Sequence, residues 1–317
     1  MNKYPCFLLF SLSLVLSCSQ RVPSKGNSSL FDFHPEKSSF ISLRNEQDIP
    51  NKGGHIQGVQ LYQKGDESYY FLTGSSANQS YLAIADVQTL KVISVQKLLD
   101  DPYRHAGGFQ IIDDLLFVGI EDNVEKDKSL VLGYRILDPA KGELALLTKI
   151  KREGIYKKAT AGSVAATKTK HHLWICVGNW DNHDLDVYQL ALDQLGNSET
   201  IPELRFSINS EKLDRSAWVE KSWFSYQNIN FFRKNESLFL AAMAEERLGG
   251  KQLLDIFVCD VEKDDLGLKK VFHQKFPKNG EAGFRWGGGV YVDETAKLKL
   301  MACGEQILNE IEVRIWE

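Results

Sequence analysis

The sequence predicts an all-β domain behind an export signal, and three observations support this. An apolar stretch of about ten residues stands near the N-terminus. Short runs rich in β-branched and aromatic residues recur through the rest of the chain, and Gly, Asn and Asp separate them. No long segment repeats apolar residues with the 3.6-residue period of a helix.

The composition is that of a globular protein with a neutral charge balance. The 317 residues include 38 basic and 42 acidic side chains, which gives a formal net charge of −4. Hydrophobic residues make up 43% of the chain and charged residues 25%, so a packed core is expected. A slightly acidic chain excludes a basic nucleic-acid-binding domain, and no nucleic-acid partner is predicted.

The N-terminal apolar stretch is typical of a secretion signal. Residues 7–16 follow Lys3 and are too few to cross the ~30 Å hydrocarbon layer as a helix. Val15-Leu16-Ser17-Cys18 then resembles the lipobox of bacterial lipoproteins. The resemblance implies a signal peptide over 1–17, cleavage before Cys18 and lipid on that cysteine. The alternative is an ordinary cleaved signal with an incidental cysteine.

A polar tether follows the predicted lipidation site. Residues 18–37 are rich in Ser, Asn, Gly, Pro and Lys and offer little apolar surface to bury. Several acyl chains hold a protein stably on a bilayer. We therefore expect a lipid-anchored protein of the bacterial cell envelope, on the non-cytoplasmic side of a membrane, with the membrane as its partner through Cys18. Which membrane, and which protein partners, stay open.

The remaining cysteines give no sign of redox or metal chemistry. Cys176, Cys259 and Cys303 are odd in number and stand in apolar runs, as small core residues do. No Cys or His pair has metal-ligand spacing. The carboxylates near Asp181 lack the glycine and the distal glutamate of a calcium loop. Neither a metal nor a cofactor is predicted.

The β-rich runs form a degenerate repeat. The first runs of successive repeats are 54–60, 105–110, 161–165, 226–231 and 286–291. The second runs are 70–74, 116–119, 174–178, 238–242 and 300–304. Third runs stand at 81–86, 130–135, 185–190, 255–260 and 311–316, and fourth runs at 91–95, 144–147, 204–208 and 268–272. The last repeat thus lacks a fourth strand.

The segment 40–43, which precedes the first repeat, is apolar-alternating and can supply that strand. Radial repetition of four-stranded units is the plan of a β-propeller. The domain over 38–317 therefore resembles a five-bladed β-propeller whose last blade is closed by an N-terminal strand. The resemblance rests on the repeat and not on a diagnostic motif. It also implies that the tether leaves the domain at the end opposite the channel mouth, which is the end where the first strands begin.

Propeller topology places two sets of loops at one end of the domain, because each blade is an up-and-down meander. The loops that lead into the first strands carry mostly basic groups: His55, Arg104, His105, Lys157, Lys158, Lys221 and Arg285. The loops that leave the second strands carry mostly acidic or amide groups: 121–123, 179–181, 245–246 and 305–306. We therefore expect a polar pocket at the channel mouth.

Thirteen residues are predicted to line this pocket. They are His55, Gln60, His105, Gln110, Glu121, Asp122, Asn179, Trp180, Asp181, Glu245, Arg285, Trp286 and Glu305. The tryptophans suit stacking on a sugar ring. The alternatives are structural roles: the acids pair with neighbouring cations, the tryptophans pack in the core, and the glycines of the first strands relieve crowding.

Three functions from different classes remain open. The preferred prediction is a binding protein for a small polar ligand or glycan. The second is a glycan- or ester-acting hydrolase with His105, Glu121, Asp181 and Glu305 as acid–base candidates. The third is a scaffold for envelope protein complexes. Residues 209–223 depart from the repeat and are predicted to form a short helix with Ser210 near its start, either covering the pocket or decorating the surface.

Overall fold

The computed structural model describes residues 31–50, 52–197, 200–246, 250–278 and 280–317. The predicted signal peptide (1–17), Cys18 and the tether up to residue 30 lie outside the described residues. Phe33–Glu317 forms one compact unit, which carries every strand reported below. This unit is called the second unit of the chain. No described helix is long and apolar enough to cross a membrane.

The second unit is all-β, as predicted, and its strands form antiparallel groups of four. The first two groups are β2 (Ile56–Lys64), β3 (Glu67–Ser75), β4 (Gln79–Asp86) and β5 (Lys91–Asp100), then β6 (His105–Ile112), β7 (Leu115–Glu121), β8 (Lys128–Asp138) and β9 (Glu143–Glu153). The next two are β10 (Ser163–Lys168), β11 (His172–Gly178), β12 (Asp184–Ala191) and β13 (Glu203–Asn209), then β14 (Asn228–Lys234), β15 (Ser237–Glu245), β16 (Gln252–Cys259) and β17 (Lys269–Phe276).

The last group joins both ends of the unit. It contains β18 (Gly283–Val292), β19 (Leu298–Cys303), β20 (Glu310–Trp316) and the N-terminal strand β1 (Ser38–Arg44). β1 pairs with β20 along its whole length, from Ser38 opposite Trp316 to Arg44 opposite Glu310. The prediction that the segment around Phe40 supplies the missing outer strand is therefore confirmed. Each run identified in the sequence lies on a strand or overlaps one.

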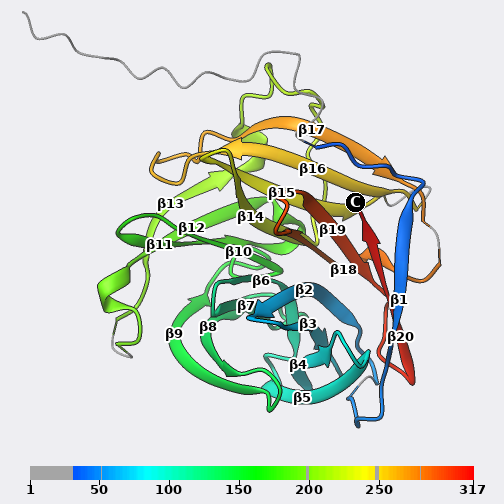
Figure 1. Ribbon diagram of the computed structural model, residues 1–317. Coiled ribbons are helices and arrows are strands. Elements are labelled where there is room, and N and C mark those ends of the chain that lie inside the picture. Colours follow the sequence, from blue (N-terminus) through cyan, green and yellow to red (C-terminus); the bar gives the residue numbers. More distant parts are fainter. Residues whose placement is uncertain (1–30, 51, 198–199, 247–249, 279) are drawn as a thin grey trace, which may run out of the picture. The chain divides into compact units, whose positions relative to one another are not determined.

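The first strand of each group lies towards the centre of this unit (Figure 1). These five strands, β2, β6, β10, β14 and β18, have edges that need hydrogen-bond partners. Buried amide side chains supply some of them. Gln110 Oε1 accepts from the backbone N–H groups of Ala166 and Phe231, at 2.9 and 2.8 Å. Gln60 Nε2 donates to Asn230 Oδ1 at 3.1 Å.

These contacts correct two predictions. Gln60 and Gln110 are only 3% and 5% exposed, and neither faces the cavity described below. Their amide groups join the central strands to one another, because strands that converge at the centre cannot satisfy all their edge groups by ladder pairing. Both glutamines are therefore structural residues of the central strands.

Crowding at the centre also explains the glycines of the first strands. A Cβ on Gly107 would come within 2.2 Å of the carbonyl oxygen of Gly162. One on Gly287 would come within 2.5 Å of Cys303 Sγ. Protein atoms already occupy this space, so glycine is needed there for close strand approach.

Apolar side chains fill the space between neighbouring groups. Phe71 and Leu82 of the first group, for example, pack with Phe109 and Val118 of the second. Full burial of side chains of this size contributes about 1.5–3 kcal/mol each. Cys176, Cys259 and Cys303 are all buried free thiols, as the prediction of core cysteines required.

The predicted helix over 209–223 is wrong. Only one 3-10 turn forms, η4 (Ser210–Lys212), and Asn209 rather than Ser210 caps it, by accepting from the backbone N–H of Glu211 at 3.0 Å. Downstream, Asp214 and Glu220 accept hydrogen bonds from the backbone N–H groups two residues later. Such local side-chain bonds compete with helix formation.

Candidate functional site

A cavity of about 350 Å³ lies where the first strands begin and the second strands end. All five strand groups contribute to its wall. The predicted residues that line it are His55, His105, Glu121, Asn179, Trp180, Asp181, Glu245, Arg285 and Trp286. The topological argument thus brings distant segments to one place. That these side chains bind a ligand stays a prediction.

Eight further described residues line the cavity: Gln57, Gly162, Asn182, Ser225, Tyr226, Gln227, Glu246 and Gly250. Gln57, Gln227 and Glu246 belong to segments that the repeat had placed at this end of the domain. Ser225 and Gly162 carry no signal of their own in the sequence, because only the loop path brings them to the cavity.

Asp122 and Glu305 were predicted to line the cavity and do not. Asp122 Oδ1 accepts from the backbone N–H groups of Val124 and Glu125, at 2.9 and 3.1 Å, and Oδ2 lies 3.3 Å from Lys128 Nζ. Burial alone would raise the pKa of Asp122, but these donors lower it overall. Asp122 therefore shapes its own loop. The side chain of Glu305 is exposed, and its backbone oxygen accepts from Ile56 N.

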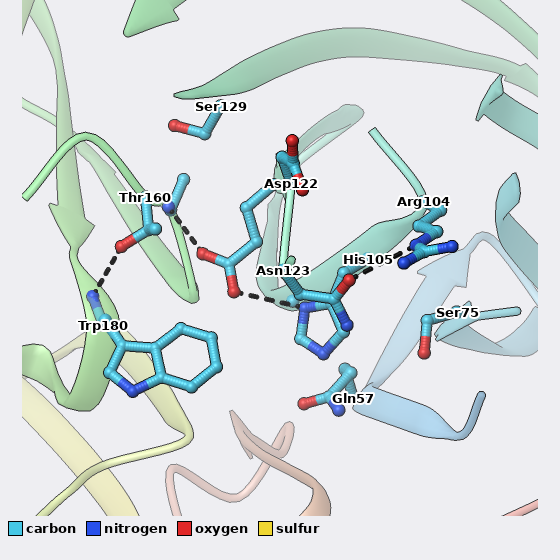
Figure 2. A network of polar contacts seen from close by, with 12 residues as sticks. Gln57, Ser75, Arg104, His105, Asp122, Asn123, Ser129, Thr160 and Trp180 are labelled. Carbon is cyan, nitrogen blue, oxygen red and sulfur yellow. Dashed lines mark hydrogen bonds and ion pairs between the residues drawn. The ribbon is translucent and has the colours of Figure 1, made fainter. Parts of the chain in front are cut away.

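A histidine–glutamate pair forms one wall. Glu121 ends β7 and is 1% exposed. Its Oε2 accepts from the backbone N–H of Ala161 at 2.9 Å, and its Oε1 lies 3.3 Å from His105 Nδ1 (Figure 2). His105 Nδ1 is buried and has no hydrogen-bond partner among the described residues, so the pair is a close approach rather than a hydrogen bond.

His55 occupies the matching position in the preceding repeat. Its ring centroid lies 5.6 Å from that of His105 and 5.1 Å from that of Trp286, with tilted planes in both cases. Gln57 Nε2 lies 3.1 Å from His55 Nε2. Burial, and then the charges of His105 and Arg285, lower the pKa of His55 from 6.5 to about 4. His55 is therefore neutral at pH 7.

The loop after β11 shapes a second wall. Asp181 and Asn182 adopt left-handed backbone conformations, with φ of 60° and 52°, and the loop holds them there. Asn182 Nδ2 donates to the carbonyl oxygen of Tyr226, Asn182 Oδ1 accepts from Ser163 Oγ at 2.9 Å, and Ser225 Oγ donates to Asp181 Oδ1. The third and fourth strand groups are thereby joined beside the cavity.

The remaining cavity acids pair with lysines. Glu245 Oε1 lies 3.3 Å from Lys278 Nζ, and Glu246 Oε1 lies 2.6 Å from Lys275 Nζ. In the described part of the chain, no three His, Cys, Asp or Glu residues are grouped as a metal site would need. Asp184 instead accepts from Asn179 and Asn209, and Asp186 pairs with Arg152.

Trp223 is packed away from the cavity. Its indole N–H donates to the carbonyl oxygen of Asn182 at 3.0 Å, and its ring lies against Trp218, Tyr226 and Phe257. Trp180 and Trp286, by contrast, line the cavity.

Comparison with known proteins identifies the class of fold. The chain is similar to an α-L-arabinofuranosidase from Podospora anserina in complex with cellotriose, with a TM-score of 0.53, 10% identity, and coverage of 87% of this chain and 94% of that one. It is also similar to the catalytic domain of a GH62 α-L-arabinofuranosidase from Coprinopsis cinerea, with a TM-score of 0.51, 12% identity, and coverage of 88% and 97%.

A GH43 endo-arabinanase from Bacillus licheniformis gives a TM-score of 0.50 at 11% identity, with coverage of 80% of this chain and 92% of that one. These neighbours are β-propeller glycoside hydrolases, and the likeness shows a propeller-like fold. Comparison of the sequence finds no matching protein family and no matching curated protein.

Proposed function

We propose that this chain is an exported, lipid-anchored, five-bladed β-propeller that binds a glycan in the cavity at its channel mouth. One observation carries the proposal: segments from all five strand groups converge on a single cavity that combines two tryptophans with carboxylate, amide and imidazole groups. Such a mixture of flat apolar faces and polar edges suits a sugar ring. A fold shared with glycoside hydrolases supports the same class of ligand.

The contacts of the carboxylates favour binding over hydrolysis. A glycosidase with two carboxyl groups needs one of them to hold a proton and donate it. Glu121 accepts from an N–H group and faces His105, while Asp181 accepts from Ser225. Glu245 and Glu246 lie beside lysines. Lys275 lowers the pKa of Glu246, and each of the other three acids already has an oxygen engaged by a protein donor, a histidine or a lysine.

A matched pair of glutamine variants tests the proposal. Gln57 lines the cavity, whereas Gln63 lies exposed near the other end of the same strand, β2. The folded domain is titrated calorimetrically with a panel of oligosaccharides. We expect Gln57→Ala and Trp286→Ala to weaken binding at least about tenfold, and Gln63→Ala to leave it unchanged. Binding that survives both cavity variants would show that the glycan lies elsewhere.

Hydrolysis is the second candidate, favoured by the His105–Glu121 pair, because a buried carboxylate can orient a histidine as a general base. The assay is release of reducing ends from the same oligosaccharides. Turnover that Glu121→Gln and His105→Ala both abolish would replace the binding proposal by this one. A scaffold would instead tolerate every cavity variant and respond to changes at exposed strand edges.

The lipid anchor is tested separately. The Val15–Cys18 pattern supports lipidation of Cys18. In a bacterial host fed an alkyne-tagged fatty acid, we expect the wild-type chain to carry the tag and to fractionate with membranes. Cys18→Ser should lose both properties, whereas Cys303→Ser should keep them. An untagged wild-type chain would indicate an ordinary cleaved signal.

A further inference from the structure

Three cations lie within 6.0 Å of the ring centroids of the two cavity tryptophans. Lys126 Nζ is 3.8 Å from the ring centroid of Trp180, and Lys157 Nζ is 6.0 Å from it. The guanidinium carbon of Arg285 is 4.9 Å from the ring centroid of Trp286. Such distances are those of cation–π contacts. The aromatic surfaces of this cavity are thus partly covered by positive charge.

The backbone holds the two lysines in this arrangement. Lys157 N donates to the carbonyl oxygen of Lys126 at 2.6 Å, and Trp180 N donates to Thr160 Oγ1 at 2.7 Å (Figure 2). Both lysines have left-handed backbones, with φ of 57° and 64°, a conformation that costs energy for residues other than glycine. Loops from two different strand connections are therefore fixed so that two ammonium groups meet at one indole ring.

The three cations that lie near the tryptophans differ from neighbouring lysines in their ion pairing. Within the described ranges, no ion pair involves Lys126, Lys157 or Arg285. Neighbouring lysines behave differently, since Lys128 pairs with Asp122 and Asp127, and Lys158 lies 3.9 Å from Asp184. The glutamates in the cavity already have His105, Lys278 or Lys275 as partners. The three cations at this rim therefore present positive charge that is not paired with any carboxylate of the described residues.

Resting on the proposed function, we propose that the ligand is an acidic glycan, one whose sugars carry carboxylate or sulfate groups. A neutral sugar could stack on Trp180 only where the ammonium groups leave its ring open, or by displacing them. An anionic sugar would instead bring its charge to Lys126, Lys157 and Arg285 and gain charge-assisted hydrogen bonds. The same rim that weakens binding of a neutral chain thus strengthens binding of an acidic one.

The experiment compares acidic oligosaccharides with chemically matched neutral ones. The probes are oligogalacturonides and sulfated galactan oligosaccharides, each beside its carboxyl-reduced or desulfated counterpart. Calorimetric titrations use wild-type protein, the double variant Lys126→Gln/Lys157→Gln, and Lys141→Gln. Lys141 is the matched control, because it stands just beyond the other end of β8 from Lys126. Thermal unfolding verifies that each variant is folded, and Lys126→Arg/Lys157→Arg keeps the charge if the glutamine variant does not fold.

We expect at least one acidic probe to bind about tenfold or more tightly than its neutral counterpart, and the preference to shrink as salt is added. The glutamine double variant should lose that preference, while the arginine variant and Lys141→Gln keep it. Equal or tighter binding of the neutral probes, weakened by Gln57→Ala, would overturn this inference and leave the proposed function standing. If neither the acidic nor the neutral probes bind, both the acidic-glycan inference and the proposed glycan-binding function are contradicted.

Discussion

Two buried carboxylates of this protein, Glu121 at the cavity and Asp255 inside the fourth strand group, differ in the number and kind of protein groups that contact them. Asp255 Oδ2 lies 2.6 Å from Lys270 Nζ, and both side chains are fully buried. The Tyr226 hydroxyl donates to the same oxygen, and His273 Nδ1 lies 2.7 Å from Oδ1. Glu121 is nearly as buried, yet its described contacts are one backbone N–H and one histidine.

The difference indicates two roles for burial. A carboxylate has about four acceptor positions, and those of Asp255 are largely used by protein donors. Aromatic rings also enclose Lys270, whose Nζ lies 5.1 Å from the ring centroid of Phe224 and 5.5 Å from that of Trp218. Asp255 is therefore structural. Glu121 lines the cavity, and its described partners use fewer of its acceptor positions.

The structural network nevertheless reaches the site. Lys270 Nζ donates to the carbonyl oxygen of Ser222 at 2.6 Å, at the start of the loop that brings Ser225 and Tyr226 to the cavity. Burial, and then the charge of Asp255, raise the pKa of Tyr226, so its hydroxyl keeps the proton that it donates. The buried ion pair thus fixes one wall of the cavity from behind.

The largest effect expected from this comparison is on stability. Lys270→Met leaves Asp255 charged and buried without its main partner, and such a change costs about 3–5 kcal/mol. Urea unfolding of the intact domain measures it. In the wild-type chain, burial lowers the pKa of Lys270, and the charge of Asp255 is the largest effect that opposes this shift.

Two further variants sharpen that prediction. Lys275→Met removes a lysine from an exposed pair on the same strand, β17, and should change stability little, because exposed ion pairs contribute little. Asp255→Asn added to Lys270→Met removes the stranded charge and should recover part of the loss. If Lys270→Met unfolds at the same urea concentration as wild type, the buried pair does not hold this wall.

The strands and the site were not equally predictable. Repetition marked the strands and the residues flanking them, so meander topology alone brought His55, His105, Asp181 and Arg285 to one cavity. Topology gives the end of a strand but not the direction of a side chain. That is why Glu305, which also follows a second strand, was expected at the cavity and instead lies exposed.

The Asp255–Lys270 pair could not be read from the sequence. Asp255 stands opposite His273, and a bulge between Ile256 and Phe257 shifts the register before Lys270 is reached. Two residues fifteen apart on adjacent strands meet only because of that irregularity. Likewise, the sequence pattern predicts Gln60 and Gln110 to be ligand-binding amides, whereas in the structure their amide groups form hydrogen bonds between the central strands. Sequence patterns identify polar groups but not which protein atoms already occupy them.

A smaller effect is expected from His55, on the cavity side of the comparison. The unfolded chain takes up a proton at His55 as the pH falls through about 6.5, whereas the folded chain does so only near 4. Between these values the unfolded state binds more protons, so stability falls as the pH is lowered. The contribution amounts to about 2 kcal/mol between pH 7 and pH 5, measured by urea unfolding at both values.

His55→Asn should remove this part of the pH dependence, because no imidazole remains to titrate at that position. His171→Asn is the control, since His171 is exposed in the folded chain, and the variant should keep the wild-type slope. A steep pH dependence that persists in His55→Asn would assign the protons to another group and would contradict a neutral, desolvated His55.

The smallest stability change, with the sharpest functional contrast, is expected for Glu121→Gln. Glutamine keeps an acceptor oxygen for the Ala161 N–H and removes the charge beside His105, so unfolding should change by only about 1 kcal/mol. Glycan binding should fall at least about tenfold, because a hydrogen bond to a charged acceptor is stronger than one to a neutral acceptor. Glu305→Gln replaces the corresponding acid of the last strand group outside the cavity and should leave both measurements unchanged. If the two variants instead behave alike in the glycan titration, Glu121 is one more structural carboxylate, and the contrast with Asp255 disappears.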